Sequence, residues 1–233
     1  MENRRTKRTN SRKKVSKSRR IILVLILILI GLIPGIFIGR HFANKQASKS
    51  YRDAYQDYST YQRLDMLNQA AIPEWIDQQI IPLDGVSRNG TLLGGYNDIV
   101  VHYVGNPNTT AQQNHDFYCN PESEVSSHFI VGLDGEIIQC IPLNEMSAAS
   151  NWRNRDTISI EVCHPDETGK FNEATYNSLV KLVAWLMNEG GLDTSHVIRH
   201  YDITGKECPL YYVNNQEAWL TFKADVASYT PNN

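Results

Sequence analysis

The sequence predicts an α/β fold, in which a central mixed β-sheet is flanked by helices and preceded by one transmembrane helix. Two patterns support this prediction. From residue 97 onward, β-branched apolar runs alternate with segments of helical period, as is typical of α/β domains. Residues 21–39 form an uncharged apolar run, close to the roughly 20 residues that cross a hydrocarbon core. With 233 residues, 41% of them hydrophobic, the chain is long enough to bury a core.

A strongly basic segment precedes the apolar run. Residues 1–20 contain ten Lys or Arg and one acid, whereas residues 41–233 contain 12 Lys or Arg and 24 acids. The positive-inside rule therefore makes 1–20 a cytoplasmic tail and places the body of the chain outside the cell membrane. The apolar run exceeds the about 7–15 residues of a signal-peptide core and lacks a small-x-small cleavage site, so we expect an uncleaved signal anchor. No motif indicates that the tail binds nucleic acid.

Residues 40–79 are expected to form a helical stalk or linker. The segment 43–71 contains no Gly or Pro, and its tyrosines recur at three- and four-residue steps, which predicts an amphipathic helix. A stalk that lifts the domain from the membrane is the simplest interpretation. A tyrosine stripe for self-association, or for docking on the domain, is the alternative. An extended lead-in with turns at 73–90 then leads into the domain, which we place at 80–233.

Local patterns predict the elements of this domain. Asp134-Gly135 lies between two apolar runs and indicates the turn of a β-hairpin. Gly190-Gly191 follows a segment with apolar residues at helical spacing and indicates a helix end. The expected strands are 99–104, 127–131, 136–141, 157–163 and 196–198, and the expected helices are 109–119, 172–189 and 215–228.

The strand expected at 157–163 has one apolar side and one polar side. Because side chains alternate along a strand, Ile158, Ile160 and Val162 face one side and Glu161 faces the other. A carboxylate is costly to bury unless a positive group lies nearby. A solvated sheet face or an ion pair with an arginine would satisfy it. A metal site would do so too, which makes Glu161 a candidate for chemistry.

The segment 199–209 concentrates metal-ligating side chains. It contains His200, Lys206 and Cys208 around one glycine. Zinc favours imidazole and thiolate ligands, and Lys206 can help to ionise a thiol while offering a positive charge to a substrate oxygen. Upstream, His102 lies near the end of an apolar strand. If the sheet aligns these strand ends, His102, His200 and Cys208 would hold zinc with one open position, as in catalytic sites. Hydrogen-bonded structural histidines are the alternative.

Four segments of the domain carry a resemblance to a known family. They are 99–103, 125–131 with the turn that follows it, 157–162 and 197–209. Together, and in this order, they resemble the zinc-dependent N-acetylmuramoyl-L-alanine amidases, a domain type shared by phage lysins, bacterial autolysins and animal peptidoglycan recognition proteins. The resemblance covers roughly residues 80–215. It implies the fold of that family, a mixed sheet flanked by helices.

The resemblance implies a role for each candidate residue. His102, His200 and Cys208 match the zinc ligands of the family. Glu161 matches its catalytic glutamate, and Lys206 matches the lysine that steadies the oxyanion. The implied substrate is peptidoglycan, cut at the amide between the lactyl group of N-acetylmuramic acid and the L-alanine of the stem peptide. The anchored domain would then face the cell wall.

The chain departs from the family pattern at one position, and alternative functions and a disulfide are also considered. Some family members have a catalytic tyrosine where this chain has Ser127, so no tyrosine is assigned a proton-transfer role. A non-catalytic peptidoglycan-binding module is one alternative function, and a cysteine hydrolase using Cys163 or Cys208 is another. If Cys208 binds metal, one disulfide could form among Cys119, Cys140 and Cys163, and the sequence does not choose the pair. Nor does it indicate an oligomeric state.

Overall fold

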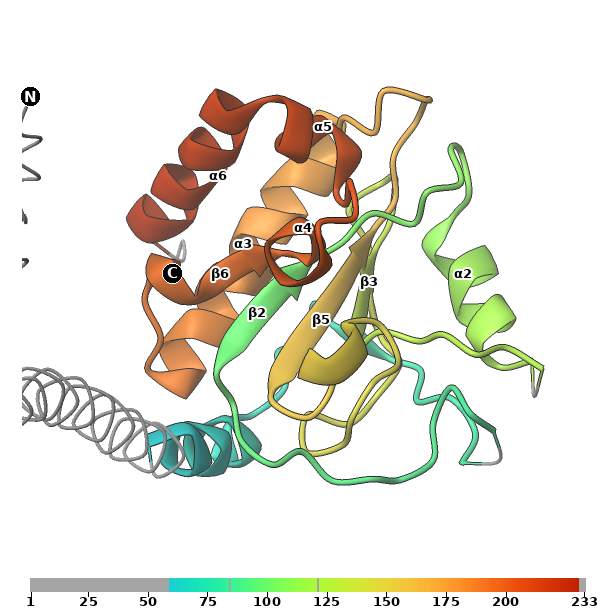
Figure 1. Ribbon diagram of the computed structural model, residues 1–233, viewed down its shortest axis with the longest axis vertical. Helices are drawn as coiled ribbons and strands as arrows, with labels where there is room; N and C mark the ends of the chain where they lie inside the picture. Colours follow the sequence, from blue (N-terminus) through green and yellow to red (C-terminus); the bar gives the residue numbers. More distant parts are fainter. Residues whose placement is uncertain (1–58, 84, 121, 231–233) are drawn as a thin grey trace, which may run out of the picture. The chain divides into compact units, whose positions relative to one another are not determined.

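The computed structural model describes residues 59–83, 85–120 and 122–230 (Figure 1). The predicted cytoplasmic tail, the predicted transmembrane helix at 21–39 and the first part of the predicted stalk lie outside these residues. Within them, no helix combines the length and the apolar character needed to cross a bilayer.

A six-stranded sheet forms the centre of the domain, with strand order β1-β4-β3-β5-β2-β6. Neighbouring strands are parallel except for β3 and β4, which form the antiparallel hairpin predicted around Asp134-Gly135. The predicted mixed sheet is therefore confirmed. The strands are β1 Asp77–Gln78, β2 Asp98–Val101, β3 Phe129–Val131, β4 Ile137–Gln139, β5 Thr157–Val162 and β6 Val197–Arg199.

The helices begin and end at recognisable signals. Thr110 forms a capping box at the start of one helix, and the side chain of Asn172 accepts a hydrogen bond from the N–H of Thr175 at the start of another. That second helix ends at Gly191, whose φ of 61° is left-handed. The helices are α2 Ala111–Tyr118, α3 Glu173–Gly190, α4 His200–Thr204, α5 Leu210–Asn214 and α6 Gln216–Ser228, with 3₁₀ turns η1 Asn151–Arg153 and η2 Thr194–His196.

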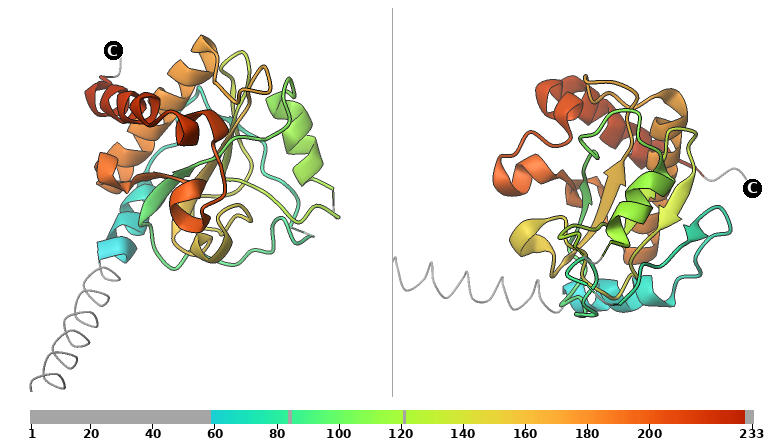
Figure 2. Two further views of the ribbon diagram at one scale, coloured as in Figure 1. Left: turned by 45° about the horizontal axis from the view of Figure 1, so that its top comes forward. Right: turned by 90° about the vertical axis from the view of Figure 1, so that its right-hand side faces the viewer.

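Helices cover both faces of the sheet, as predicted. In Figures 1 and 2, α3 and α6 lie on one side of the strands and α2 lies on the other. The first face forms the larger apolar core, in which Ile160 packs with Leu182 of α3 and Phe222 of α6. A smaller cluster occupies the second face, where Ile130 packs with Tyr118 of α2. Both layers bury apolar side chains, which is the main stabilising contribution to such a fold.

Some element boundaries differ from the expected ones. Strand β2 ends at Val101 rather than at residue 104, although the His102 N–H still donates to the Ile160 carbonyl oxygen at 2.9 Å. Strand β6 begins one residue later than expected, because His196 belongs to η2, which the Asp193 side chain caps. The two short helices α4 and α5 were not predicted, because five residues leave too little room for a helical period to repeat.

The described part of the predicted stalk packs against the domain. Residues 59–69 are helical, and Leu64 and Leu67 of this helix lie in the larger core together with Ile76. Leu67 is fully buried, whereas Tyr61 on the same helix is 54% exposed. Residues 59–79 therefore belong to the compact unit, although their sequence pattern was interpreted as a linker.

Candidate metal centre

The register of three parallel strands brings the candidate residues together. Strand β2 lies between β5 and β6, and Val101 pairs with Ile160 on one side and with Arg199 on the other. One residue further along each strand, His102, Glu161 and His200 therefore lie side by side. The predicted alignment of strand ends is thus present in the fold.

Cys208 completes the cluster from a loop. The potential ligand atoms of His102, His200 and Cys208 all lie within 4.8 Å of one another, and the three residues are buried. The loop turns back after α4, which ends at Gly205 with a φ of 78°. The Tyr201 N–H then donates to the Cys208 carbonyl oxygen at 3.0 Å, which holds the thiol beside the histidines.

The Nε2 atoms of both imidazoles contact the segment Ser150-Asn151. His200 Nε2 donates to Asn151 Oδ1 at 2.8 Å, and His102 Nε2 lies 3.2 Å from Ser150 Oγ. The segment is itself held, because the Ser150 N–H donates to Asn154 Oδ1 at 2.6 Å. Contacts of this kind orient histidine ligands in metal sites and leave the other ring nitrogen, here Nδ1, for the metal.

Glu161 is the charged group next to this cluster. Its Oε1 lies 3.8 Å from His102 Nδ1, and its side chain is 18% exposed. Its Oε2 is buried and has no hydrogen-bond partner among the described residues. Burial raises the pKa of this carboxyl to about 8, although the charge of Lys206 acts in the opposite direction. A carboxylate in this position can interact with a bound cation and can accept a proton from a molecule bound to that cation.

The protonation of the ligands also fits a metal. Burial lowers the pKa of His102 and of His200, with a further contribution from the positive charge of Lys206, so both imidazoles are neutral and able to bind a cation. Burial raises the pKa of Cys208 to about 12, and the nearby charge of Glu161 acts in the same direction. Lys206 lowers that pKa, as predicted, but burial outweighs it. A metal ion must therefore displace the thiol proton when it binds.

The cluster lies in a pocket of about 470 Å³. Phe117 and Val125 form an apolar part of its wall and are 54% and 47% exposed. Lys206 lines the same pocket and is exposed to solvent, so its ammonium group is available to a ligand. The pocket thus combines metal-ligating atoms, a buried carboxyl group and a positive charge.

The sequence did not indicate three residues of this site. Ser150 and Asn151 lie in a turn without a recognisable motif, and the φ of 54° at Asn151 is visible only in the structure. Tyr118, at the end of α2, lines the pocket, and its hydroxyl lies 3.4 Å from Ser127 Oγ. Ser127 itself is fully buried and donates to the Phe129 carbonyl oxygen, so this serine is bonded within the fold.

The remaining cysteines lie away from the ligand cluster. No disulfide joins the four cysteines, all of which lie in the part of the chain that the structure describes. Cys140 and Cys163 are buried in the smaller apolar cluster. Burial raises the pKa of Cys163 to about 12 and raises that of Cys140 further, so neither thiol is activated as a nucleophile.

Comparison with known proteins places this site in a family. The family model for N-acetylmuramoyl-L-alanine amidase matches residues 95–210. Two amidases of Bacillus subtilis (strain 168) are similar to this chain. BlyA is 30% identical, and the alignment covers 61% of this chain and 44% of BlyA. XlyA is 32% identical, and the alignment covers 65% of this chain and 50% of XlyA. This chain spans about half the length of the curated relatives it matches.

Solved structures show the same relationship. The catalytic domain of XlyA superimposes with a TM-score of 0.58 at 30% identity, and the alignment covers 65% of this chain and 98% of that domain. PlyL superimposes with a TM-score of 0.60 at 25% identity, over 67% of this chain and 99% of the PlyL chain. The chain therefore belongs to the N-acetylmuramoyl-L-alanine amidase family.

Proposed function

We propose that the protein is a zinc-dependent peptidoglycan hydrolase. It cleaves the amide between the lactyl group of N-acetylmuramic acid and the L-alanine of the stem peptide. One observation carries this proposal: the ligand atoms of His102, His200 and Cys208 converge within 4.8 Å in a pocket that also holds Glu161 and Lys206. Membership of the amidase family supports the choice of bond.

Zinc is the metal that suits these donors. Two neutral imidazoles and one thiolate form a borderline-soft donor set, and three protein ligands leave a position open for chemistry. Ser150 and Asn151 hold the imidazoles in orientation, and Cys208 loses its proton on binding. A bound zinc ion would supply an activated water molecule at neutral pH and polarise the scissile carbonyl.

Glu161 is placed to move protons during the reaction. In the metal-free protein the pKa of this carboxyl is about 8, and a group that titrates near neutral pH can act as a general acid and base. It accepts a proton from the water molecule that attacks the amide carbon. It then returns a proton to the alanine nitrogen as the amide bond breaks. Lys206 directs a positive charge into the same pocket, where it stabilises the developing oxyanion.

A membrane-anchored location completes the proposal. The basic segment 1–20 stays in the cytoplasm, and the helix at 21–39 spans the cell membrane. The predicted stalk then leads to the amidase domain, whose compact unit includes residues 59–79 and which faces the cell wall. The charge asymmetry and the apolar run in the sequence support this topology. The anchor would keep the hydrolase close to its polymeric substrate.

The structure disfavours the two alternatives considered. A module that only binds peptidoglycan has no need for an assembled ligand triad beside a buried carboxyl, and this chain has both. A cysteine hydrolase needs an ionised thiol. Burial keeps the pKa of Cys163 and of Cys208 far above neutral in the metal-free protein.

Product analysis tests the function directly. Purified cell wall is digested with the full chain in detergent, and mass analysis looks for free L-alanine amino termini on the stem peptides. We expect these termini to appear, to vanish on treatment with a chelator and to return with zinc. Cys208→Ser should weaken zinc binding, measured as metal content. Activity that resists the chelator but is lost on thiol alkylation would instead identify a cysteine hydrolase.

A further inference from the structure

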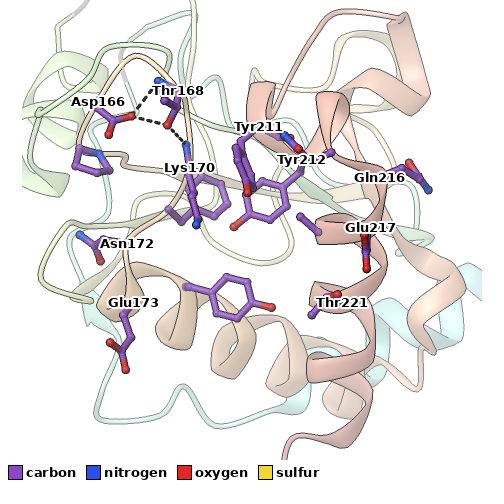
Figure 3. A pocket seen from close by; sticks show the side chains of 15 residues that line it. Asp166, Thr168, Lys170, Asn172, Glu173, Tyr211, Tyr212, Gln216, Glu217 and Thr221 are labelled. Carbon is purple, nitrogen blue, oxygen red and sulfur yellow. Dashed lines mark hydrogen bonds between the residues drawn. The ribbon is translucent and has the colours of Figure 1, made fainter.

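A second and larger pocket lies next to the segment that follows β5. It has a volume of about 900 Å³, within the roughly 300–1,000 Å³ of small-molecule sites. The loop 165–172, the start of α3, α5 and the first turns of α6 form its walls. Figure 3 shows Tyr211 and Tyr212 between the side chain of Lys170 on one side and those of Gln216 and Glu217 on the other. None of these residues takes part in the chemistry proposed above.

Aromatic rings held rigidly by the core line this pocket. Tyr211 packs edge-on against Tyr212 at a centroid distance of 5.2 Å, and Tyr212 packs on Phe171 at 4.7 Å. Tyr176 also lines the pocket, and its hydroxyl donates to Asp225 Oδ2. Both Tyr176 and Tyr211 are half-buried. Rings fixed in this way offer apolar surface to a ligand at little cost in conformational entropy.

The rim of the pocket is polar and mixed in charge. Lys170, Glu217 and Thr221 are exposed, and their side chains make no hydrogen bond to other described residues, although Lys170 Nζ lies over the Tyr211 ring at 5.5 Å from its centroid. The Asp166 carboxylate, by contrast, accepts hydrogen bonds from the N–H and the hydroxyl of Thr168. Free donors and acceptors of both charges around aromatic rings suit a neutral ligand with many hydroxyl and amide groups better than a strongly charged one.

The loop that borders the large pocket packs against a residue of the metal pocket, which is the pocket around His102, His200 and Cys208. Tyr103 lines the metal pocket, and the His164 ring packs on it at a centroid distance of 5.0 Å. Gly169, in the loop that borders the large pocket, lies so close to Tyr103 and Leu210 that a Cβ there would be 3.3 Å and 3.2 Å from their side-chain atoms. Tyr103 therefore lies next to the loop whose residues Thr168 and Lys170 line the large pocket.

We propose that the large pocket binds N-acetylated sugar units of the glycan strand at a distance from the bond that is cut. The aromatic rings would stack on the apolar faces of the sugars, and Lys170, Glu217 and Thr221 would bond their hydroxyl and acetamido groups. This inference rests on the proposed function, because only a polymeric wall substrate would occupy both pockets at once. The site would orient the strand and lengthen its residence on the enzyme.

Titration with chitotetraose, the tetramer of N-acetylglucosamine, tests the proposal. Isothermal calorimetry on the full chain in detergent micelles should show saturable binding. Tyr211→Ala should weaken that binding at least tenfold by removing a stacking surface. Thr221→Trp should do the same by filling the pocket from an exposed position, which makes the test independent of any folding defect in Tyr211→Ala. Tyr61→Ala, at an exposed tyrosine outside the pocket, should leave binding unchanged.

Three outcomes would overturn the site. The first is the absence of saturable binding. The second is equal binding by Tyr211→Ala, Thr221→Trp and the unmodified protein. The third is loss of binding in Phe117→Ala but not in the two pocket variants, which would place the sugar in the metal pocket. A titration with the free stem peptide belongs to the same experiment, because binding of the peptide alone would assign the pocket to that part of the substrate. Cleavage of a small muramyl peptide by the unmodified protein is measured in parallel. If the protein binds the sugar but does not cleave this peptide, the proposed function is rejected and the sugar site is not.

Discussion

The two faces of strand β5 serve different purposes. Ile158, Ile160 and Val162 point into the larger core and are fully buried there. On the opposite face, Glu161 points into the metal pocket with one carboxylate oxygen left unbonded among the described residues. Successive residues of one strand therefore contribute to stability and to chemistry in turn.

This separation keeps the cost of the site local. The buried carboxyl of Glu161, which has one oxygen without a hydrogen-bond partner among the described residues, is unfavourable in the metal-free protein. The neighbouring apolar side chains offset that cost, because each fully buried aliphatic side chain contributes about 1.5–3 kcal/mol. Substitutions on the two faces should consequently have separable effects, and four predictions examine how far that separation goes.

The largest effect is expected for Glu161→Gln. The amide keeps the size of the side chain but can no longer exchange a proton, and loss of a general acid or base typically lowers kcat by about 10²–10⁴-fold. Zinc content and the unfolding midpoint should stay near those of the unmodified protein. Full activity of this variant in cell-wall digestion would remove Glu161 from the mechanism.

The matched change on the other face is Ile160→Ala. It leaves a cavity in the larger core and should lower the free energy of unfolding by about 2–5 kcal/mol, measured by denaturant titration. Zinc affinity should change little at temperatures where the variant is folded. If Glu161→Gln proved as destabilising as Ile160→Ala, the two faces would not be separate in function.

A third prediction concerns His128, a structural histidine on the polar face of the sheet. Its Nδ1 accepts from the Ser159 N–H at 3.0 Å, and its Nε2 donates to the Glu145 carbonyl oxygen at 2.9 Å. Burial lowers its pKa from 6.5 to about 4, so the unfolded chain binds its proton more readily than the folded one. Its contribution to stability is fully present above pH 6.5 and is lost as the pH falls to 4.

The loss from this one group should be about 3 kcal/mol of unfolding free energy. Denaturant titrations at pH 7 and pH 4.5 on the unmodified chain and on His128→Gln measure it. Other groups titrate in both proteins, so the difference between the two pH dependences isolates His128. Identical pH dependences would show that this histidine is not held neutral by the fold.

The smallest effect is expected at Asn151, which contacts the proposed metal ligand His200. Removing such a contact typically weakens metal affinity about 10–100-fold. Asn151→Gly should show this loss without adding backbone strain, because glycine accepts the positive φ at this position. Asn151→Asp keeps an acceptor for His200 Nε2 and should retain most of the affinity. A zinc titration with a competing chelator distinguishes the two, and equal affinity in all three proteins would contradict the positioning role.

The sequence was sufficient for those features that depend on local patterns. Strand periodicity placed Glu161 and Ile160 on opposite faces of the same strand, and the Asp134-Gly135 turn identified the hairpin of β3 and β4. The grouping of His102 with His200 could be anticipated as well, because both follow apolar strands and parallel strands end at a common edge. These inferences need only the alternation of side chains and the direction of the chain.

The rest depends on contacts between distant segments. Nothing in the local pattern around Asn151 shows that its amide meets His200, and a five-residue helix such as α4 is too short to show a period. The helix at 59–69 has a polar composition, so the burial of Leu67 against the domain was not apparent. The large pocket is likewise formed by surfaces that come together only in the folded chain.

The position of β2 in the sheet has a consequence for when the candidate metal centre can form. Strand β2 precedes both of its neighbours, β5 and β6, by a long stretch of chain, and two of the three candidate ligands follow β6. Pairings so distant in sequence form slowly, because a long loop must close before the contacts repay its entropy. A nascent or truncated chain that stops before Val197 carries His102 and Glu161 but has no complete ligand set. The complete candidate ligand cluster therefore forms only in a chain that includes β6 and the loop to Cys208.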